Sequence, residues 1–350
     1  MTTAPPARRL RVLESFRTPR ATTNPYLVLL LRSLAPHADV RTFSWPAALL
    51  GRYDVLHVHW PEVVVERRHP VRAAAAAALF ALVLVRCRLT RVAVVRTAHN
   101  LAPHEPRSAL VRAVLRLCDR TTTLWIRLNP STPTPPGAAA RTVVHGHYRD
   151  WFDVDPAEHL PVPGRLTYVG LIRPYKGVEA LVEAFSRVPD PDLALRVAGR
   201  PHTPALAAAV AAAAAGDERI TLRLEHLPDD ELAREVLDAE LVVLPYREMH
   251  NSGAALLALS LDRPVLVTDN EVTRALAAEV GEHWVQRCAG PLDAAALARA
   301  LADVRATPGG RPDLSARDWG PLGAQHAAAF AEAVAARRGR RAPAPAGRPR

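Results

Sequence analysis

Short apolar stretches alternate with longer amphipathic ones along most of the chain. In the first half, five stretches rich in aliphatic and β-branched residues are each followed by polar or turn residues, which predicts strands at 10–13, 40–43, 55–59, 92–97 and 122–126. Helical patterns lie between them, at 25–34, 71–85 and 108–117. This alternation predicts a parallel sheet with helices on both of its faces.

The alternation is interrupted once and then begins again. Residues 145–164, HGHYRDWFDVDPAEHLPVPG, contain three prolines and no clear period, which indicates an inter-domain linker and hinge. Beyond them we predict strands at 166–169, 193–198, 221–224, 241–244 and 265–268, and helices at 178–186, 204–214, 229–237, 254–261 and 294–304. An alanine-rich helix at 322–338 follows.

The expected architecture is therefore α/β, with two doubly wound, Rossmann-like domains that face each other across a cleft. We assign residues 1–150 to the first domain, 151–336 to the second including its final helix, and 337–350 to a disordered arginine-rich tail. In such sheets ligands gather at the carboxyl ends of the strands, so function is expected in the residues that follow them.

Charge divides the chain in the same way. The formal net charge of the 350 residues is +10, and residues 1–150 carry 22 arginines against 8 acidic residues. Residues 151–336 carry 17 basic against 27 acidic residues. Opposite charges predict different partners for the two domains. All but one of the 45 basic residues are arginine, and the exception, Lys176, requires an explanation.

Three widely spaced cysteines and the N-terminal sequence favour a protein of the reducing cytosol. The cysteines form no CxxC pair, and residues 1–16 lack the apolar core of a signal peptide. The longest apolar run, 71–85, is shorter than the roughly 20 residues of a spanning helix. Two interpretations stay open for it, a buried helix and a helix that lies in a membrane surface.

Two cations follow the first strand of the second half. Gly170 would let a ligand approach the backbone, and Arg173 and Lys176 precede the N-terminus of a helix, a favourable place for an anion such as a diphosphate. Gly199 ends the next strand in the same manner. After strand 241–244 comes Pro-Tyr-Arg-Glu-Met-His-Asn-Ser-Gly, in which Asn251 or Ser252 can cap the next helix and Gly253 leaves its amides open.

These segments carry a resemblance. YVGLIRPYKGVEALVEAF, LRVAG and LVVLPYREMHNSGAALLALSLDRPVLVTD resemble, in order and spacing, the nucleotide-sugar domain of GT-B glycosyltransferases. TNPYL, RYDVLHVHWPE, RTAHNLAPHE and HGHYRDWF further resemble the xanthan-type β-mannosyltransferases, so that the likeness covers roughly residues 10–335. One departure is that Glu248 is followed eight residues later by Leu256, where many retaining enzymes have a second glutamate. This suits an inverting enzyme.

The resemblance implies transfer of mannose, with inversion, from GDP-mannose to a polyprenyl-diphosphate-linked glycolipid in exopolysaccharide biosynthesis, at the inner face of the cell membrane and without a metal cofactor. Arg173 and Lys176 would hold the donor diphosphate. The further donor-binding residues would be Gly170, Gly199, Tyr246, Asn251, Ser252 and Gly253, with Arg200 also near the nucleotide.

The first domain would supply the acceptor site and a general base. An inverting transfer needs one Asp, Glu or His to deprotonate the acceptor hydroxyl, and Glu62, His99 and Glu105 follow strands at the expected edge, with Glu62 preferred. Asn24, His59, Trp60 and Asn100 would contact the acceptor, and Trp60 could stack on a sugar ring.

Several other functions are weighed against this one. His57 and His59 have a metal-like spacing, but no third ligand is evident; the DxD pairs Asp153/Asp155 and Asp190/Asp192 lie in proline-flanked loops typical of turns. Neither a GxGxxG nor a P-loop is present, which argues against dinucleotide and ATP binding. The nearest alternative is a GT-B glycosyltransferase with another nucleotide-sugar donor or a simpler acceptor. A nucleotide-sugar epimerase and a non-catalytic nucleotide-sugar-binding protein also remain alternatives. Nucleic-acid binding has no recognition motif to support it.

Overall fold

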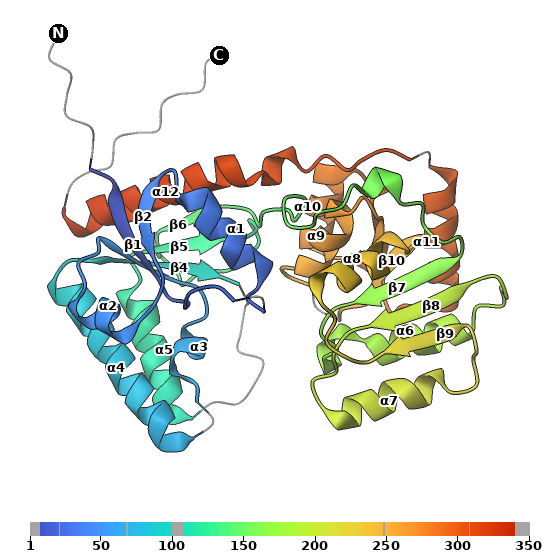
Figure 1. The fold of residues 1–350 in the computed structure, drawn as a ribbon, viewed down its shortest axis with the longest axis horizontal. Helices are drawn as coiled ribbons and strands as arrows, with labels where there is room; N and C mark the ends of the chain where they lie inside the picture. The colour runs from blue at the N-terminus through green and yellow to red at the C-terminus, as the bar shows by residue number, and fades with distance from the viewer. Residues whose placement is uncertain are drawn as a thin grey trace, which may run out of the picture. The chain divides into compact units, whose positions relative to one another are not determined.

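The chain folds into two compact units. The computed structural model describes residues 8–20, 22–67, 69–99, 108–247, 249–307 and 309–339. One unit runs to Gly146 and resumes at Arg317, and the other comprises His147–Ala316 (Figure 1). The predicted α/β class is confirmed, because each unit contains a six-stranded sheet in which all strand pairs are parallel.

The sheet of the first unit has the strand order β2-β1-β3-β4-β5-β6. Its strands are β1 (Leu10–Glu14), β2 (Ala38–Arg41), β3 (Val55–Val58), β4 (Ala93–Ala98), β5 (Leu124–Arg127) and β6 (Ala140–Thr142). The helices are α1 (Pro25–Leu34), α2 (Trp45–Leu50), α3 (Pro61–Val65), α4 (Pro70–Leu89), α5 (Ala109–Thr121) and α12 (Trp319–Arg337). Helices α2, α3 and α5 pack around α4, whereas α12 lies against α1 and the central strands.

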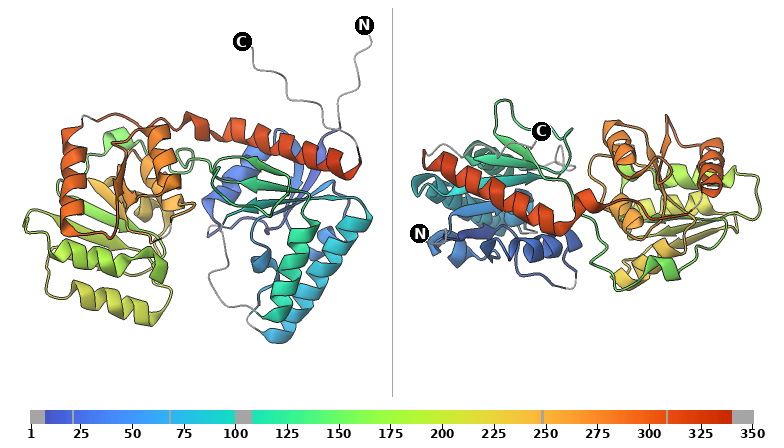
Figure 2. Two further views of the ribbon diagram at one scale, coloured as in Figure 1. Left: turned by 180° about the vertical axis from the view of Figure 1, so that it is seen from behind. Right: turned by 90° about the horizontal axis from the view of Figure 1, so that it is seen from above.

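The last helix corrects the expected domain assignment, which placed it in the second domain. Helix α12 belongs to the first unit and lies along β3, β4 and β5 (Figure 2). Its buried side chains recur every three or four residues, including Leu322, His326 and Phe330, and form one face. The sequence period reveals that such a face exists but not which of the two sheets it covers.

The sheet of the second unit has the order β12-β11-β10-β7-β8-β9. Its strands are β7 (Arg165–Val169), β8 (Ala194–Ala198), β9 (Ile220–Arg223), β10 (Leu241–Leu244), β11 (Val265–Thr268) and β12 (Val285–Cys288). The helices are α6 (Val178–Ser186), α7 (Pro204–Ala214), α8 (Asp229–Leu237), α9 (Gly253–Ser260), α10 (Glu271–Val280) and α11 (Ala294–Ala306), with single 3₁₀ turns at Pro156–Glu158, Pro174–Lys176 and Ser315–Arg317.

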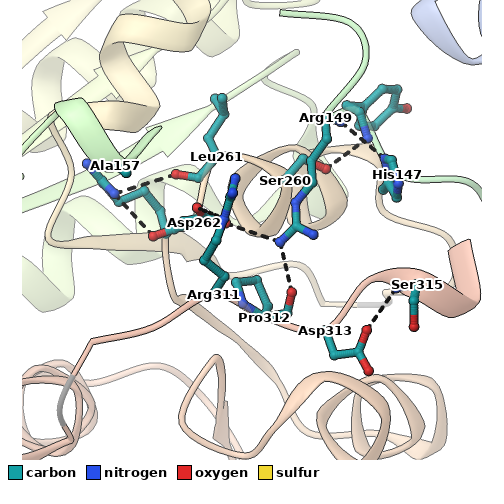
Figure 3. A network of polar contacts seen from close by, with 12 residues as sticks. His147, Arg149, Ala157, Ser260, Leu261, Asp262, Arg311, Pro312, Asp313 and Ser315 are labelled. Atoms are coloured by element: carbon teal, nitrogen blue, oxygen red, sulfur yellow. Dashed lines mark hydrogen bonds and ion pairs between the residues drawn. The ribbon is translucent and has the colours of Figure 1, made fainter. Parts of the chain in front are cut away.

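From His147 onward, the segment 145–164 that was expected to be a linker belongs to the second unit and is bound to it by an ion pair and hydrogen bonds. Arg149 forms an ion pair with Asp262 at 3.2 Å and donates a hydrogen bond to the Pro312 carbonyl at 2.8 Å (Figure 3). The amide of Tyr148 donates to Ser260 Oγ at 2.8 Å. The chain therefore passes from the first unit to the second at Gly146/His147 and returns at Ala316/Arg317. Two segments of the polypeptide connect the units, where the sequence predicted one linker.

Most predicted elements are present, and all but one of the missed ones are short. The sequence pattern did not predict α2, α3, β6, α10 or β12. Helix α4 runs from Pro70 to Leu89, past both ends of the predicted range 71–85, and is 20 residues long. The expectation that this segment is too short to span a membrane is therefore wrong. Among the described residues it is the helix whose length and composition would permit a crossing, with a third of the relevant window buried. Cys87, Cys118 and Cys288 are free and buried.

We predict that Phe330→Ala lowers the free energy of unfolding of the first unit by about 3–5 kcal/mol, because it leaves a cavity between α12 and the sheet. Phe330 is fully buried, whereas Gln325, on the same helix, is exposed. Urea unfolding of the two variants checks this, with Gln325→Ala as the control. Equal stabilities would contradict the packing of α12 on this sheet.

Candidate active site

In the second unit, the strands β7 and β10 lie side by side at the point where the strand order reverses. The chain leaves β7 toward β8 on one side and leaves β10 toward β11 on the other. The loops that follow these two strands therefore diverge and leave a crevice at their carboxyl ends, where ligands bind in doubly wound sheets. The predicted donor residues come from these loops and from the end of β8.

Two glycines allow these loops to approach each other closely. Gly199 has a φ of +157°, and a Cβ atom there would overlap the carbonyl oxygen of Gly170. Gly177 adopts the left-handed conformation with a φ of +63°, and a Cβ atom there would press on the carbonyl of Pro245. The amide of Arg247 donates to the Tyr175 carbonyl at 2.9 Å. The loops after β7 and β10 thus form one joined structure.

The expected cations lie at this edge. The Lys176 ammonium lies 4.8 Å from the centroid of the Tyr246 ring, a cation–π distance, and Tyr246 itself is buried. Arg173 and Arg200 line a cavity of about 260 Å³ together with His202. Within the described ranges, neither Arg173, Lys176 nor Arg200 forms an ion pair with a carboxylate. A polyanionic ligand would therefore meet cations whose charge is not already neutralised.

A larger hollow of about 610 Å³ in the same unit differs in this respect. Its arginines are already paired, Arg274 with Asp269, and Arg287 with Glu282 at 2.7 Å. The cavity beside Arg173 is therefore the better anion site.

Helix α9 brings its N-terminus to the same edge of the sheet. Ser252 Oγ accepts a hydrogen bond from the Ala255 amide at 3.1 Å and so caps the helix, as the sequence predicts. Gly253 leaves room for the Tyr148 hydroxyl, which would lie 3.1 Å from a Cβ atom. Asn251 is half-buried beside them. Glu248 lies outside the described residues.

In the first unit, a buried carboxylate lies at the equivalent point of the sheet. The strand order reverses between β1 and β3, and Glu14, the last residue of β1, pairs in register with His57. Glu14 Oε1 lies 3.1 Å from His57 Nδ1, and Glu14 Oε2 lies 3.1 Å from His59 Nε2. All three side chains are buried. Glu14 is not among the site residues predicted from the sequence, although its place at the end of the first strand was a usable signal.

His99 extends this cluster. Its Nε2 lies 3.0 Å from His59 Nδ1, and its ring stacks on Trp60 with centroids 3.9 Å apart and planes inclined by 25°. The structure therefore brings together three of the predicted residues, His59, Trp60 and His99.

Of the other predicted residues of the first domain, two are described by the structure and two are not. Asn24 is exposed and caps α1 by accepting from the Tyr26 amide at 3.0 Å. Glu62 is half-buried in the first turn of α3. Asn100 and Glu105 lie outside the described residues, so their roles stay predictions.

Burial and charge set the protonation of the cluster. Burial alone would raise the pKa of Glu14, but the charges and hydrogen bonds of His57 and His59 outweigh it and lower the pKa to about 2. Burial lowers the pKa of His59 and of His145 to about 4, and that of His326 to about 3. Burial, followed by the charge of His59, lowers the pKa of His99 as well. At neutral pH Glu14 is therefore an anion, and the lowered pKa values of His59 and His99 favour the neutral form of both rings.

The same cluster has the composition of a metal site, since ligand atoms of Glu14, His57 and His59 all lie within 4.8 Å of one another. However, both nitrogens of each imidazole already face a hydrogen-bond partner. One nitrogen of each ring faces Glu14, and the other faces Thr97 in the case of His57 and His99 in the case of His59. The polar atoms are therefore satisfied without an ion, and we describe the group as a hydrogen-bond network.

Comparison with known proteins decides the family. A curated GDP-mannose:glycolipid 4-beta-D-mannosyltransferase of Xanthomonas campestris pv. campestris is 49% identical over 337 residues, which cover 95% of this chain and 95% of the relative. The chain belongs to this family of mannosyltransferases. A family model for group 1 glycosyl transferases also matches residues 163–306 of this glycosyltransferase, from the start of β7 to the end of α11.

Solved structures agree on the fold of the glycosyltransferase. Sucrose-phosphate synthase from Thermosynechococcus elongatus matches with a TM-score of 0.57 at 18% identity, covering 95% of this chain and 98% of that one. Anabaena Alr3699/HepE in complex with UDP matches with a TM-score of 0.56 at 12% identity, covering 95% and 100%. The GT-B expectation is thereby confirmed.

We predict that the mannosyltransferase loses stability as the pH falls below about 6.5. Below this pH the unfolded chain binds protons on histidines that stay neutral in the folded protein until about pH 4. Each such histidine lowers the free energy of unfolding by about 1.4 kcal/mol per pH unit. Thermal unfolding from pH 7.5 to 5 measures this. His326→Leu should weaken the dependence by one proton, whereas His69→Leu, at an exposed position, should leave it unchanged. An equal slope in both variants would contradict the assignment.

Proposed function

We propose that the enzyme transfers mannose from GDP-mannose to a polyprenyl-diphosphate-linked oligosaccharide, with inversion, in exopolysaccharide biosynthesis. The observation that carries the proposal is the 49% identity, over 95% of both chains, to a relative named for GDP-mannose, a glycolipid acceptor and a 4-beta product. The cations beside β7 fit the donor, and the buried histidine cluster beside β1 fits a proton-transfer site.

Inversion follows from the chemistry of these substrates. GDP-mannose carries its nucleotide in the α configuration, so a β product requires attack on C1 from the opposite face in a single displacement. The acceptor hydroxyl must lose a proton to a base while the GDP departs with the bonding electron pair.

The residues of the second unit would act on the leaving group. Arg173 and Lys176 oppose the negative charge that develops on the β-phosphate, and the capped N-terminus of α9 adds oriented amide dipoles. Lys176 is held over Tyr246, which leaves room for a compact ammonium where a planar guanidinium would need more space. This accounts for the single lysine of the chain.

We further propose that the reaction needs no metal ion, because these cations supply the charge that a divalent ion provides in other glycosyltransferases. The two DxD pairs support this. Asp155 Oδ1 accepts from the Ala157 amide at 3.1 Å, and Asp190 Oδ1 accepts from the Asp192 amide at 3.0 Å. Both carboxylates stabilise turns in their own loops.

We propose that α4 attaches the enzyme to the inner face of the cell membrane. One face of the helix, including Phe80 and Leu84, lies in the core of the first unit. The opposite face exposes an apolar stripe with spacings of three and four residues: Val71, Ala75, Ala78, Leu82, Val85 and Leu89. The helix contains three arginines and no acidic residue. An apolar stripe with basic flanks suits an anionic lipid surface, whereas spanning the bilayer would remove Phe80 and Leu84 from the core.

We predict that Lys176→Ala lowers kcat/KM for GDP-mannose by about 10²–10³-fold, the usual scale for losing a group that stabilises a developing anion. The assay measures transfer from labelled GDP-mannose to membrane glycolipids. Arg234→Ala serves as the control, since Arg234 is an exposed cation of the same unit. If the wild type were inert with GDP-mannose and active with a UDP-sugar, the donor assignment would be wrong.

We predict that replacing Leu82 and Val85 together by aspartate lowers binding to vesicles of phosphatidylglycerol and phosphatidylethanolamine at least tenfold, because two charges would enter the apolar boundary. Leu160→Asp, at a position 88% exposed in the second unit, is the matched control. Vesicle co-sedimentation measures the binding. Unchanged vesicle binding together with loss of a wild-type dimer would show instead that the stripe pairs two copies of the chain.

A further inference from the structure

One loop of the second unit carries several of the predicted donor residues and lies beyond the end of the sheet. We call its described residues, 245–247 and 249–252, the donor loop, which connects β10 to α9. Tyr246 lies in this loop, and Ser252 at its end caps α9. The backbone pairing of β10 with β11 ends at Leu244, before the loop begins. Other contacts must therefore hold the loop in place.

Two side chains of the turn between β11 and α10 supply such contacts. Thr268 Oγ1 donates a hydrogen bond to the Tyr246 carbonyl at 2.6 Å. Asn270 Nδ2 donates one to the Met249 carbonyl at 2.9 Å. Tyr246 and Met249 are buried, and a buried carbonyl that lacks a hydrogen bond destabilises the fold. The turn thus binds the backbone of the donor loop at two points.

Asn270 uses both ends of its side-chain amide. Its Oδ1 accepts a hydrogen bond from the Thr273 amide at 2.9 Å and caps α10, whereas its Nδ2 donates to the donor loop. A backbone amide only donates and a carbonyl only accepts, so the two partners fix the orientation of the side chain. Aspartate or serine would cap the helix equally well, because the cap needs only an oxygen. The NH₂ group of Asn270 therefore serves the loop and not the cap.

The turn that provides these two side chains is itself held firmly. The Asn270 amide donates to Thr273 Oγ1 at 2.9 Å, and Thr273 Oγ1 donates to the Thr268 carbonyl at 2.9 Å. The amide of Asp269, between them, donates to the Cys288 carbonyl of β12 at 2.9 Å. A side chain can position a partner only when its own backbone is fixed, and this condition is met here.

A shift of the donor loop would reach the cations of the candidate site through Tyr246. The Tyr246 ring lies 4.8 Å from the Lys176 ammonium. The amide of the adjacent Arg247 donates to the carbonyl of Tyr175, which directly precedes Lys176 in the chain. Loss of the contacts that hold the loop would therefore displace the positive charge that meets the donor diphosphate.

We propose that Thr268 and Asn270 are positioning residues for the donor, which hold the donor loop in the conformation that binds the diphosphate of the nucleotide sugar. This assignment rests on the proposed mannosyl transfer. Each of the two side chains acts through a backbone carbonyl and not through contact with the substrate. A misplacement of about 1 Å that starts far from the reacting atoms lowers the rate of an enzyme by up to about 10²-fold.

Asn270→Asp and Asn270→Ser test the role, because both keep an oxygen that caps α10 and remove the group that donates to Met249. We expect each variant to raise KM for GDP-mannose and to weaken the binding of GDP by about fivefold, the scale of one hydrogen bond. KM for the glycolipid acceptor should stay within about twofold of the wild type, since a loop of the donor site is changed. Aspartate adds a charge and serine does not, so a loss common to both comes from the missing hydrogen bond. Steady-state kinetics and calorimetry with GDP measure the effects.

Thr268→Val is an independent test on the second contact. Valine has the shape of threonine and suits the end of a strand, but it cannot donate to the Tyr246 carbonyl. We expect the same rise of about fivefold in KM for GDP-mannose. Thr268→Ser keeps the hydroxyl and should restore KM to within about twofold of the wild type.

Asp293→Ala is the matched control for a loss of helix capping. Asp293 Oδ1 accepts from the Ala296 amide at 2.7 Å and caps α11 in the same unit. Asn270→Ala and Asp293→Ala each remove an N-cap, so thermal unfolding should show a similar loss of stability in both. We expect only Asn270→Ala to raise KM for GDP-mannose.

Three outcomes would overturn the proposal. The first is folded Asn270→Asp and Asn270→Ser enzymes with the GDP affinity and KM for GDP-mannose of the wild type. The second is a Thr268→Ser enzyme that loses as much as Thr268→Val, which would show that the hydroxyl has no role. The third is an Asp293→Ala enzyme with the same rise in KM as Asn270→Ala, which would show a general effect of stability. Failure of the proposed function is distinct, because the wild type would then use another nucleotide sugar, and the variants would be compared with that donor and its nucleoside diphosphate.

Discussion

The reversal of strand order in each parallel sheet is the constraint on which the rest of this enzyme depends. Where two neighbouring strands send their crossover helices in opposite directions, the loops at their carboxyl ends diverge and leave backbone amides and side chains uncovered. In the first unit this point lies between β1 and β3, and in the second between β7 and β10. The strand order of the sheets thereby determines the two places where a ligand can bind, and the side chains at these places determine the chemistry.

The two sites carry opposite charges, and the charge of each site is opposite in sign to the net charge of the part of the chain around it. The strongly basic first part of the chain buries an anion, Glu14, whereas the acidic second part presents the cations Arg173 and Lys176. Net charge acts over long distances and is screened by salt, so it affects membrane attraction more than binding geometry. A pair of cations within a few ångströms of a phosphate is screened far less. Composition therefore predicts the partners of a domain better than it predicts the residues of its site.

The sequence was sufficient for the fold class and for the donor side of the site because both depend on local patterns. The strand at 241–244 and the helices at 25–34 and 178–186 have the predicted bounds, since each has a clear apolar pattern, and the helix at 25–34 also begins with a capping asparagine and a proline. Lys176, Ser252 and Gly253 lie where a strand–loop–helix pattern places them. Helix α10 escaped prediction although Asn270 and Thr273 form a capping box at its start, a local signal that the sequence contains.

What the sequence could not show depends on contacts between distant segments. Phe330 packs on a sheet that is formed by residues more than two hundred positions earlier, and periodicity contains no such information. Glu14 looks like an ordinary charged residue at the end of a strand until the register pairs it with His57. Among the candidate bases, Glu62 was slightly favoured over Glu105 and His99, but spacing alone could not choose between them. The contacts of His99 emerge only from the folded sheet.

The existence of the buried cluster is itself an argument about its purpose. Removing a carboxylate from water costs several kcal/mol, and hydrogen bonds from two imidazoles only partly offset this, so apolar side chains of similar volume would commonly be as stable or more stable at such a place. The surrounding residues show that this packing was open to the chain, because Phe330 and Tyr26 already lie against the histidine rings. Stability alone therefore gives no reason for Glu14. A carboxylate that contacts the rings of two histidines holds both rings in one orientation, which the proposed proton-transfer site would require.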